Sequence, residues 1–160
     1  MATRSNIAIK NTDGTIRSIY CHWDGYPAHN GEMLRRYYNT TDKINKLIDL
    51  GSVSSLRPEL GEKHPFDRNY EEPELEGMYD NWTLAYHRDR GEDLRIDTFQ
   101  DAVEYVDNGE EYMYLWDGQN WLVNDHGEKD KHGFPVFDFV ENKISQKDLE
   151  SIGWEPEGVA

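Results

Sequence analysis

Alternating apolar and polar positions near the start of the chain predict a β-hairpin. Apolar side chains recur at every second position in segments 7–9 and 19–23, on either side of the turn-forming Thr12-Asp13-Gly14. A two-residue turn would place Ile9 opposite Ser18. A three-residue turn with a left-handed Gly14 places Ile7 opposite Ile19, and we favour it because it gathers the apolar side chains on one face. That face holds Ile7, Ile9, Ile19, Cys21 and Trp23, which we expect in the core, and Tyr20 and His22 share the other face.

After this hairpin, the apolar residues between positions 33 and 48 have the spacing typical of helices. The apolar side chains that fall on one helical face are Met33, Leu34, Tyr37 and Tyr38. A second short helix begins at a Thr40 or Thr41 cap and ends at Gly51. Its apolar side holds Ile44, Leu47 and Ile48. The pattern therefore predicts two short helices with a break between them.

Three further elements are predicted between residues 82 and 109. Residues 82–87 alternate as a strand, and residues 87–95 form a charged turn. Thr98 then caps a helix, with Asp101 three residues further on as in a capping box, and Gly109 ends it. The strand face would hold Trp82, Leu84 and Tyr86, and the apolar side of the helix Phe99, Ala102, Val103 and Val106.

The clearest hairpin pattern lies at residues 112–123. Asp117-Gly118 favours a two-residue turn of the primed type. This turn sets Trp116 opposite Gln119, Tyr114 opposite Trp121 and Tyr112 opposite Val123. One face then holds Tyr112, Tyr114, Trp116, Trp121 and Val123, and the other Met113, Leu115 and Leu122. Because both faces are apolar, we expect this hairpin to be central and covered on both sides, with Trp121 in the core.

Together these elements predict an α+β fold, an antiparallel sheet built from local hairpins with several short helices packed against it. A short strand at 134–140 and a helix at 145–153 complete the pattern. The length of 160 residues suits a single domain over residues 1–160 with a short C-terminal tail. An acidic, proline-containing loop interrupts it at about 57–81, where eight acids and three bases carry a charge of -5.

Charge and composition narrow the classes of function. Seventeen basic and 32 acidic residues give a net charge of -15, so direct binding to nucleic acid is not expected. The acidity serves either solubility or the occupation of a basic groove on another protein. No stretch approaches the roughly 20 apolar residues of a membrane-spanning helix, so no membrane partner is expected. Cys21 is the single cysteine, so no internal disulfide can form, which fits a reducing cytoplasm. We expect Cys21 to be a small buried side chain.

The segment from Asp13 to Tyr38, DGTIRSIYCHWDGYPAHNGEMLRRYY, resembles a group of small accessory proteins encoded by tailed bacteriophages. That group carries the motif IYCHWDGYP, followed by a short helix and a segment like the LGSVSSL of residues 50–56. AYHRDRGEDL and the YLWDG-x-x-W hairpin resemble the group as well, so the likeness covers most of the chain outside 57–81 and the tail. The resemblance implies a phage origin, a place in the cytoplasm of the infected bacterial host, and a task in managing that host.

Two groups of side chains are candidates for binding a ligand or partner. Tyr20, His22, Asp24 and Tyr26 lie outside the main core face and would form a patch able to hydrogen-bond and stack. His87, Arg88 and Arg90 form a rare positive cluster, since arginine recognises carboxylates and phosphates with forked donors. Salt bridges to Glu92, Asp93 or the acidic loop are the structural alternative for these arginines. Side by side, the two groups would make a pocket for an anionic aromatic ligand such as a nucleotide.

Three hypotheses remain open. In the first, the protein binds and blocks a host defence or nucleic-acid-processing protein with an acidic surface that includes Glu71, Glu72, Glu74 and Glu76. In the second, it is a sponge that sequesters a nucleotide immune signal. In the third, it is a small hydrolase that uses His22 and Asp24. No metal site, cofactor or established catalytic motif is predicted, because paired ligand spacings, a P-loop and a serine elbow are missing.

Overall fold

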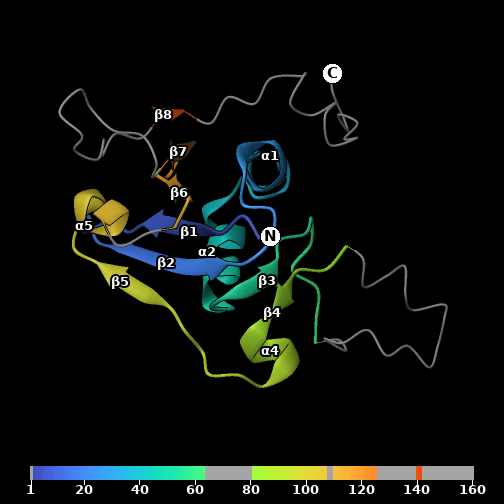
Figure 1. Cartoon of the computed structure of the whole chain (residues 1–160). Coiled ribbons are helices and arrows are strands. Elements are labelled where there is room, and N and C mark those ends of the chain that lie inside the picture. Colours follow the sequence, from blue (N-terminus) through green and yellow to red (C-terminus); the bar gives the residue numbers. More distant parts are fainter. Residues whose placement is uncertain (1, 64–80, 108–109, 126–139, 142–160) are drawn as a thin grey trace, which may run out of the picture.

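The computed structural model describes residues 2–63, 81–107, 110–125 and 140–141, which form a mixed sheet with short helices against it (Figure 1). The strands are β1 (Ser5–Lys10), β2 (Ile16–Cys21), β3 (Val53–Ser55), β4 (Leu84–Ala85), β5 (Asp97–Phe99), β6 (Tyr112–Trp116), β7 (Trp121–Asp125) and β8 (Val140–Glu141). The helices are α1 (Glu32–Tyr37), entered through a π-helical turn at Pro27–Gly31, then α2 (Thr41–Asp49), α4 (Tyr86–Arg90) and α5 (Ala102–Asp107). Within these residues the strand order is β4-β3-β2-β1-β6-β7-β8, with β5 paired to β2. The fold is α+β, as the sequence predicts.

The expectation of an antiparallel sheet is only partly right. The hairpin pairs β1–β2 and β6–β7 are antiparallel, but β1 pairs with β6, and β2 with β3, in parallel. Parallel neighbours need a crossover, and α1 and α2 lie in the crossover from β2 to β3. These pairs join segments that no tight turn connects, so patterns of local alternation do not reveal them.

The first hairpin has the predicted register. Ile7 pairs with Ile19, and Gly14 has a φ of 91° in a turn closed by a 3.0 Å hydrogen bond from its N–H to the Asn11 carbonyl. Ile7, Ile19 and Cys21 are fully or almost fully buried. The turn at Asp13-Gly14 and this part of the face assignment are therefore confirmed.

Trp23 does not belong to this buried face, and its assignment to the core was wrong. Its side chain is 44% exposed. Strand β2 ends at Cys21, and Asp24 has a positive φ of 57°, so the alternation of the strand no longer applies at position 23. The Trp23 N–H instead donates to the Ser54 carbonyl beside β3, at 3.0 Å.

The second hairpin keeps its predicted faces but not its predicted register. Trp116 pairs with Trp121, Tyr114 with Val123 and Tyr112 with Asp125, which is a shift of two residues. The Asp117 carboxylate accepts hydrogen bonds from the N–H groups of Gln119 and Asn120, so the loop closes over residues 117–120 instead of Asp117-Gly118 alone. A shift of two leaves every side chain on its own face, because strands alternate with period two.

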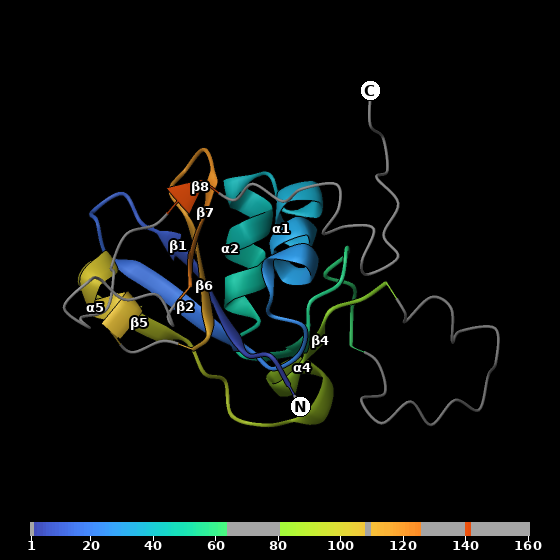
Figure 2. The same ribbon diagram turned by 45° about the horizontal axis from the view of Figure 1, so that its top comes forward.

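One face of the sheet carries the larger core and is covered by α1 and α2. In Figure 2 these two helices stand together on one side of the strands. Thr40 caps α2 by accepting a hydrogen bond from the Lys43 N–H, and Gly51 follows the helix with a φ of 77°, as predicted. The buried cluster on this face includes Ile7, Ile19, Cys21, Leu34, Tyr38, Ile44, Leu47, Ile48, Tyr114, Trp116 and Trp121.

The opposite face of the sheet is covered at one end by α5. A smaller buried cluster there consists of Ala8, Ile16, Tyr105, Met113 and Leu115, with Phe99 and Ala102 against it. Both faces of β6 are therefore buried, which confirms the predicted central position for this strand of the hairpin. Thr98 lies in β5 and does not cap the helix. The cap is Asp101, whose carboxylate accepts a hydrogen bond from the Glu104 N–H at 2.9 Å.

The segment predicted as a strand at 82–87 and a charged turn at 87–95 has a different structure. Strand β4 spans only Leu84–Ala85, and the short helix α4 begins at Tyr86. The buried Asp89 carboxylate accepts a hydrogen bond from the Ala85 N–H, and Gly91 ends the helix with a φ of 76°. Because Asp89 turns inward in this way, the run of charged residues folds back as a helix.

Several predicted elements fall outside the described residues. These are the strand at 134–140 apart from Val140 in β8, the helix at 145–153, most of the acidic loop, the side chains of Val103 and Val106, and Gly109. Among the helices that are described, none has the length and apolar character needed to cross a membrane.

The two tryptophans provide a matched test of the core. Trp121 is 4% exposed and donates its indole N–H to the Tyr38 carbonyl at 2.8 Å, so Trp121→Ala should lower the free energy of unfolding by about 3–5 kcal/mol. Trp23→Ala should cost less than about 1 kcal/mol, because much of that side chain is already in water. Urea unfolding of both variants measures the difference, and equal losses would contradict this description of the fold.

Candidate functional site

The motif YCHWDGYP divides into a buried half and an exposed half. In the buried half, the Cys21 thiol is inaccessible and accepts a hydrogen bond from the Asn30 side-chain amide at 3.2 Å. The same amide also approaches Ser5 Oγ and the Trp23 carbonyl, each at 3.3 Å. Burial raises the pKa of Cys21 to about 11. A thiol with this pKa remains protonated at neutral pH, so Cys21 is a structural residue and not a nucleophile.

Gly25 is fixed by close packing against the start of the chain. A side chain there would place its Cβ 2.7 Å from Ser5 Cβ and 2.8 Å from the Thr3 carbonyl oxygen, so only glycine fits. Its N–H donates to the Thr3 carbonyl at 2.8 Å, and its carbonyl accepts a 2.7 Å hydrogen bond from the buried Tyr114 hydroxyl. The turn is therefore held from two sides and gives the exposed half of the motif a rigid support.

The exposed half carries a row of rings formed by Tyr20, His22 and Trp23. The Tyr20 hydroxyl lies 2.6 Å from His22 Nδ1, and the His22 ring meets the Trp23 ring edge to face at 4.7 Å. Asp24 lies beside Tyr26. Burial raises the pKa of Tyr26, and the charge and hydrogen bond of the Asp24 carboxylate add to that rise. The structure therefore brings Tyr20 together with His22, and Tyr26 together with Asp24, but forms no hydrogen bond between His22 and Asp24.

The second predicted cluster has a structural role at Arg88. Its guanidinium donates to the Leu60 and Thr83 carbonyls, each at 2.7 Å, and to the Gly61 carbonyl at 3.2 Å. It also pairs with the buried Asp89 carboxylate at 2.8 Å. These four partners occupy the forked donors that an anionic ligand would need, which corrects the expectation that Arg88 is available for recognition.

The neighbours of Arg88 turn toward Glu92. His87 Nδ1 lies 2.7 Å from the Glu92 carbonyl oxygen. The Arg90 guanidinium lies 3.8 Å from the Glu92 carboxylate, and the side chains of Arg90 and Glu92 are both more than half exposed. Arg90 therefore forms a salt bridge with Glu92, which is the structural alternative that the sequence left open. Neither Arg88 nor Arg90 lines the pocket that lies beside Tyr20.

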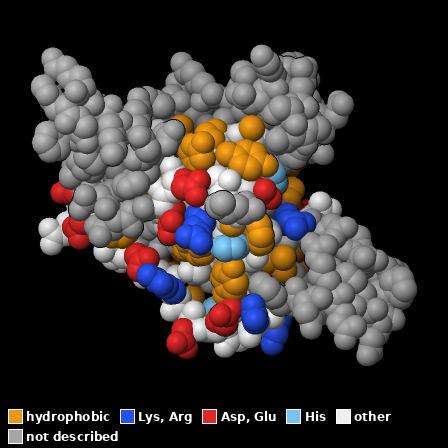
Figure 3. Space-filling model, in the orientation of Figure 1, with side chains coloured by type: hydrophobic (Ala, Val, Ile, Leu, Met, Phe, Trp, Pro, Cys, Tyr) orange, Lys and Arg blue, Asp and Glu red, His pale blue; other side chains and the backbone are white. Residues whose placement is uncertain are grey.

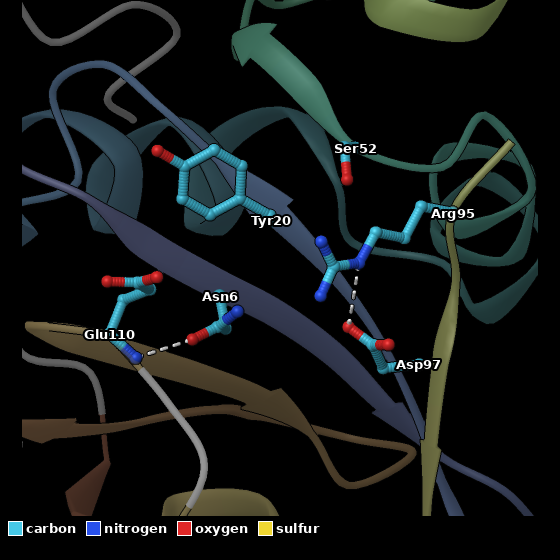
Figure 4. A pocket seen from close by; sticks show the side chains of 6 residues that line it. All are labelled: Asn6, Tyr20, Ser52, Arg95, Asp97 and Glu110. Atoms are coloured by element: carbon cyan, nitrogen blue, oxygen red, sulfur yellow. Dashed lines mark hydrogen bonds and ion pairs between the residues drawn. The ribbon is translucent and has the colours of Figure 1, made fainter. Parts of the chain in front are cut away.

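That pocket has a volume of about 250 Å³ and is lined by Asn6, Tyr20, Ser52, Arg95, Asp97 and Glu110 (Figure 4). Asn6 and Tyr20 are cross-strand partners in β1 and β2, so they share a face of the sheet and form the floor. Arg95 lies 3.9 Å from the Asp97 carboxylate, and the Glu110 N–H donates to Asn6 Oδ1 at 2.7 Å. Sequence reasoning identified Tyr20 but missed the other lining residues, because the four segments that carry them meet β2 only in the folded sheet.

Two further predictions concern the acidic residues of the loop and possible metal ligands. Glu71, Glu72, Glu74 and Glu76 lie outside the described residues. In the part of the chain that is described, no group of three or more His, Cys, Asp or Glu side chains is placed to hold a metal ion.

Comparison of the chain with protein-family models, with curated proteins and with solved structures found no match. The geometry described above is therefore the basis for a functional proposal.

The role of Arg88 can be tested by conservative substitution. Arg88→Lys should lower the free energy of unfolding by about 1–3 kcal/mol, because an ammonium group cannot serve four acceptors that are spread over Leu60, Gly61, Thr83 and Asp89. Arg90→Lys, the matched control two residues away, should change it by less than about 0.5 kcal/mol. Chemical denaturation measures both, and an Arg88→Lys variant as stable as the control would refute the structural role.

The buried thiol should leave a signature in alkaline solution. The pKa of Cys21 rises from 9.0 to about 11 on folding, so between these values the unfolded chain loses a proton that the folded chain keeps. Stability should then fall with rising pH, by up to about 1.4 kcal/mol per pH unit from this group. The buried tyrosines act in the same direction, so the contribution of Cys21 is the difference between the wild type and Cys21→Ser, measured by urea unfolding from pH 8 to 11. Identical slopes for the two proteins would contradict a buried, protonated thiol.

Proposed function

We propose that the chain is a phage-encoded accessory protein that binds a host protein and blocks it in the cytoplasm of the infected bacterium. The phage assignment is supported by the resemblance carried by IYCHWDGYP. The blocking role is supported by the surface that this motif presents, and the preference for a basic partner by the distribution of charge.

The observation that carries the proposal is the exposed Trp23 on a rigid support. Its side chain is 44% exposed and stands edge to face with His22, while Asn30 and Gly25 fix the backbone on either side. A large aromatic ring held in place at the surface loses little conformational entropy on binding. Tryptophan is also enriched among the residues that contribute most to protein–protein affinity. The ring therefore suits an anchor for a macromolecular partner.

Charge indicates the nature of that partner. Residues 1–63 hold seven acids and nine bases, whereas residues 64–160 hold 25 acids and eight bases. The net charge of -15 therefore arises entirely beyond residue 63. A strongly acidic segment following a nearly neutral one favours a basic surface as its target, for example the groove of a nucleic-acid-processing protein.

Several basic side chains in the described part of the chain already have acidic partners. Arg17 pairs with Asp49 at 3.0 Å, Arg36 with the buried Glu32, and Arg88 with the buried Asp89. Figure 3 shows acidic and basic side chains interspersed on the face seen in Figure 1. Cations paired in this way do not offer an extended positive surface to an anionic partner.

The two alternative functions have less support. A nucleotide sponge needs a positive pocket, but the pocket beside Tyr20 places two carboxylates, Asp97 and Glu110, against the single guanidinium of Arg95. A hydrolase that used His22 and Asp24 would need them as a pair. Instead His22 Nδ1 is occupied by the Tyr20 hydroxyl, and Asp24 lies beside Tyr26.

Phage plating tests the proposal. A phage that depends on this protein is complemented with variants and plated on the host that restricts it. Trp23→Ala should weaken the affinity for the host partner about thirtyfold or more and lower the efficiency of plating, because an anchoring aromatic contributes about 2 kcal/mol or more. Neutralising Glu71, Glu72, Glu74 and Glu76 together should also lower it, with the fold intact.

Two controls accompany these variants. Leu94→Ala removes the other large exposed apolar side chain among the described residues, which is 51% exposed, and should leave plating unchanged. His22→Ala combined with Asp24→Asn should lower plating much less than Trp23→Ala, since Asn30 and Gly25 still fix the backbone and asparagine also tolerates the positive φ at position 24. The opposite pattern, with that double variant inactive and both Trp23→Ala and the acidic variant active, would refute the proposal.

A further inference from the structure

The pocket beside Tyr20 occupies the part of the sheet that α5 leaves open. On this face α5 covers Ala8, Ile16 and Leu115, and its Tyr105 is buried against them. Asn6 and Tyr20 lie on the same face one step further along β1 and β2, and the pocket opens above them. The pocket therefore forms at the edge of α5, where this face of the sheet is no longer covered by a helix.

The two ends of the pocket differ in charge. At one end the Arg95 guanidinium reaches over toward Asp97, as Figure 4 shows, but the contact is 3.9 Å long and the Arg95 side chain is 75% exposed. At the other end lies the Glu110 carboxylate, which forms no hydrogen bond or ion pair with any residue that the structure describes. Among the lining residues one cation faces two carboxylates, and Glu110 is the carboxylate that has no described partner of its own.

Tyr20 lies between these ends. Figure 4 shows its ring face on, with Glu110 and Asn6 on one side and Ser52 and Arg95 on the other. Burial raises the pKa of Tyr20, while the charge of Arg4 lowers it and the charge of Glu110 adds to the rise, so both charges lie within electrostatic reach of the phenol. Tyr20 is partly buried. A partly exposed aromatic ring beside a carboxylate is a pair of features that binds a cation, by attraction to the ring and by charge-assisted hydrogen bonds.

The size of the pocket selects a small group. Sites for drug-sized ligands measure about 300–1,000 Å³. At about 250 Å³ this pocket falls below that range and suits a single side chain better than a whole nucleotide. A phosphate group would also meet the carboxylates of Asp97 and Glu110. A guanidinium, by contrast, is planar, stacks on an aromatic ring and offers forked donors to a carboxylate.

We infer that the pocket receives an arginine side chain of the basic partner, with its guanidinium paired to Glu110 and stacked over the Tyr20 ring. This inference rests on the proposed function, because it assigns one point of contact to the partner. The exposed Arg95 remains paired with Asp97, so this second carboxylate does not draw the incoming cation away from Glu110.

Nuclear magnetic resonance of the full chain tests the pocket with blocked arginine, N-acetyl-arginine N-methylamide, as the probe. Titration to millimolar concentrations should shift the resonances of the Tyr20 ring and the Asn6 side-chain amide. The same titration with blocked citrulline, which has the same shape and no charge, should shift them about tenfold less at equal concentration.

Glu110→Gln should weaken the arginine response by about tenfold, because it removes the charge-assisted hydrogen bonds and leaves the backbone N–H to Asn6 in place. Glu111→Gln is the matched control, since it removes an equal charge from the exposed neighbouring position and should leave the response unchanged. Thermal unfolding of both variants confirms that each is folded.

Three outcomes would overturn the inference: no shift with arginine, equal shifts with citrulline, or equal losses in the two glutamine variants. A stronger response to adenosine monophosphate than to arginine would do so as well and would favour the sponge. The inference and the proposed function can fail separately. A pocket that ignores arginine while Trp23→Ala still lowers plating refutes only the inference. A pocket that binds arginine while Trp23→Ala plates normally refutes the proposed function and leaves only the arginine-binding pocket standing.

Discussion

The side-chain amide of Asn30 is buried at the point where three segments of the chain meet. It lies within hydrogen-bond distance of Ser5 at the start of β1, Cys21 at the end of β2 and the carbonyl of Trp23 in the turn that follows. A buried amide that lost these partners would cost about 1–3 kcal/mol for each unsatisfied group. Because the three contacts hold only in one arrangement, Asn30 fixes where β2 ends and how the chain leaves the sheet. The exposed ring of Trp23 and the position of Tyr20 both follow from that exit.

Much of the fold could be predicted from local patterns. The register of the first hairpin, the Thr40 cap, the Gly51 stop and the two faces of β6 each depend on residues close together in sequence. The errors came from interactions that do not show in the spacing of apolar residues along the sequence. Asp117 and Asp89 each used a carboxylate to bind nearby backbone N–H groups. One loop was lengthened in this way, and a helix replaced the end of a predicted strand and the start of a predicted turn. The parallel pairs of β1 with β6 and β2 with β3 join distant segments and left no local signal.

The candidate site was predictable only in part, for a related reason. Tyr20 and His22 could be placed on the face away from the main core because they alternate with Ile19 and Cys21. Which arginine accompanies them could not be deduced, since Arg88 and Arg95 differ only in what surrounds them after folding. Arg88 turns to carbonyl groups of the 60–61 and 83 segments, whereas Arg95 lies over the open end of the sheet. The assignment of Trp23 failed because tertiary contacts of the turn override the alternation of the strand.

The parallel pairing of β1 with β6 also has a consequence for the growing chain. The hydrogen bond between Asn6 and Glu110 joins positions 104 residues apart, so the inner edge of β1 has no partner until β6 has left the ribosome. At translation rates of about 5–20 residues per second, this delay lasts roughly 5–20 s. Throughout that interval, the hairpin of β1 and β2 presents an unpaired strand edge with Ile7 and Ile9 beside it, which is the kind of surface that associates with other nascent chains. Premature termination before residue 112 would make that exposure permanent, so synthesis of the last third of the chain protects its first strand from aggregation.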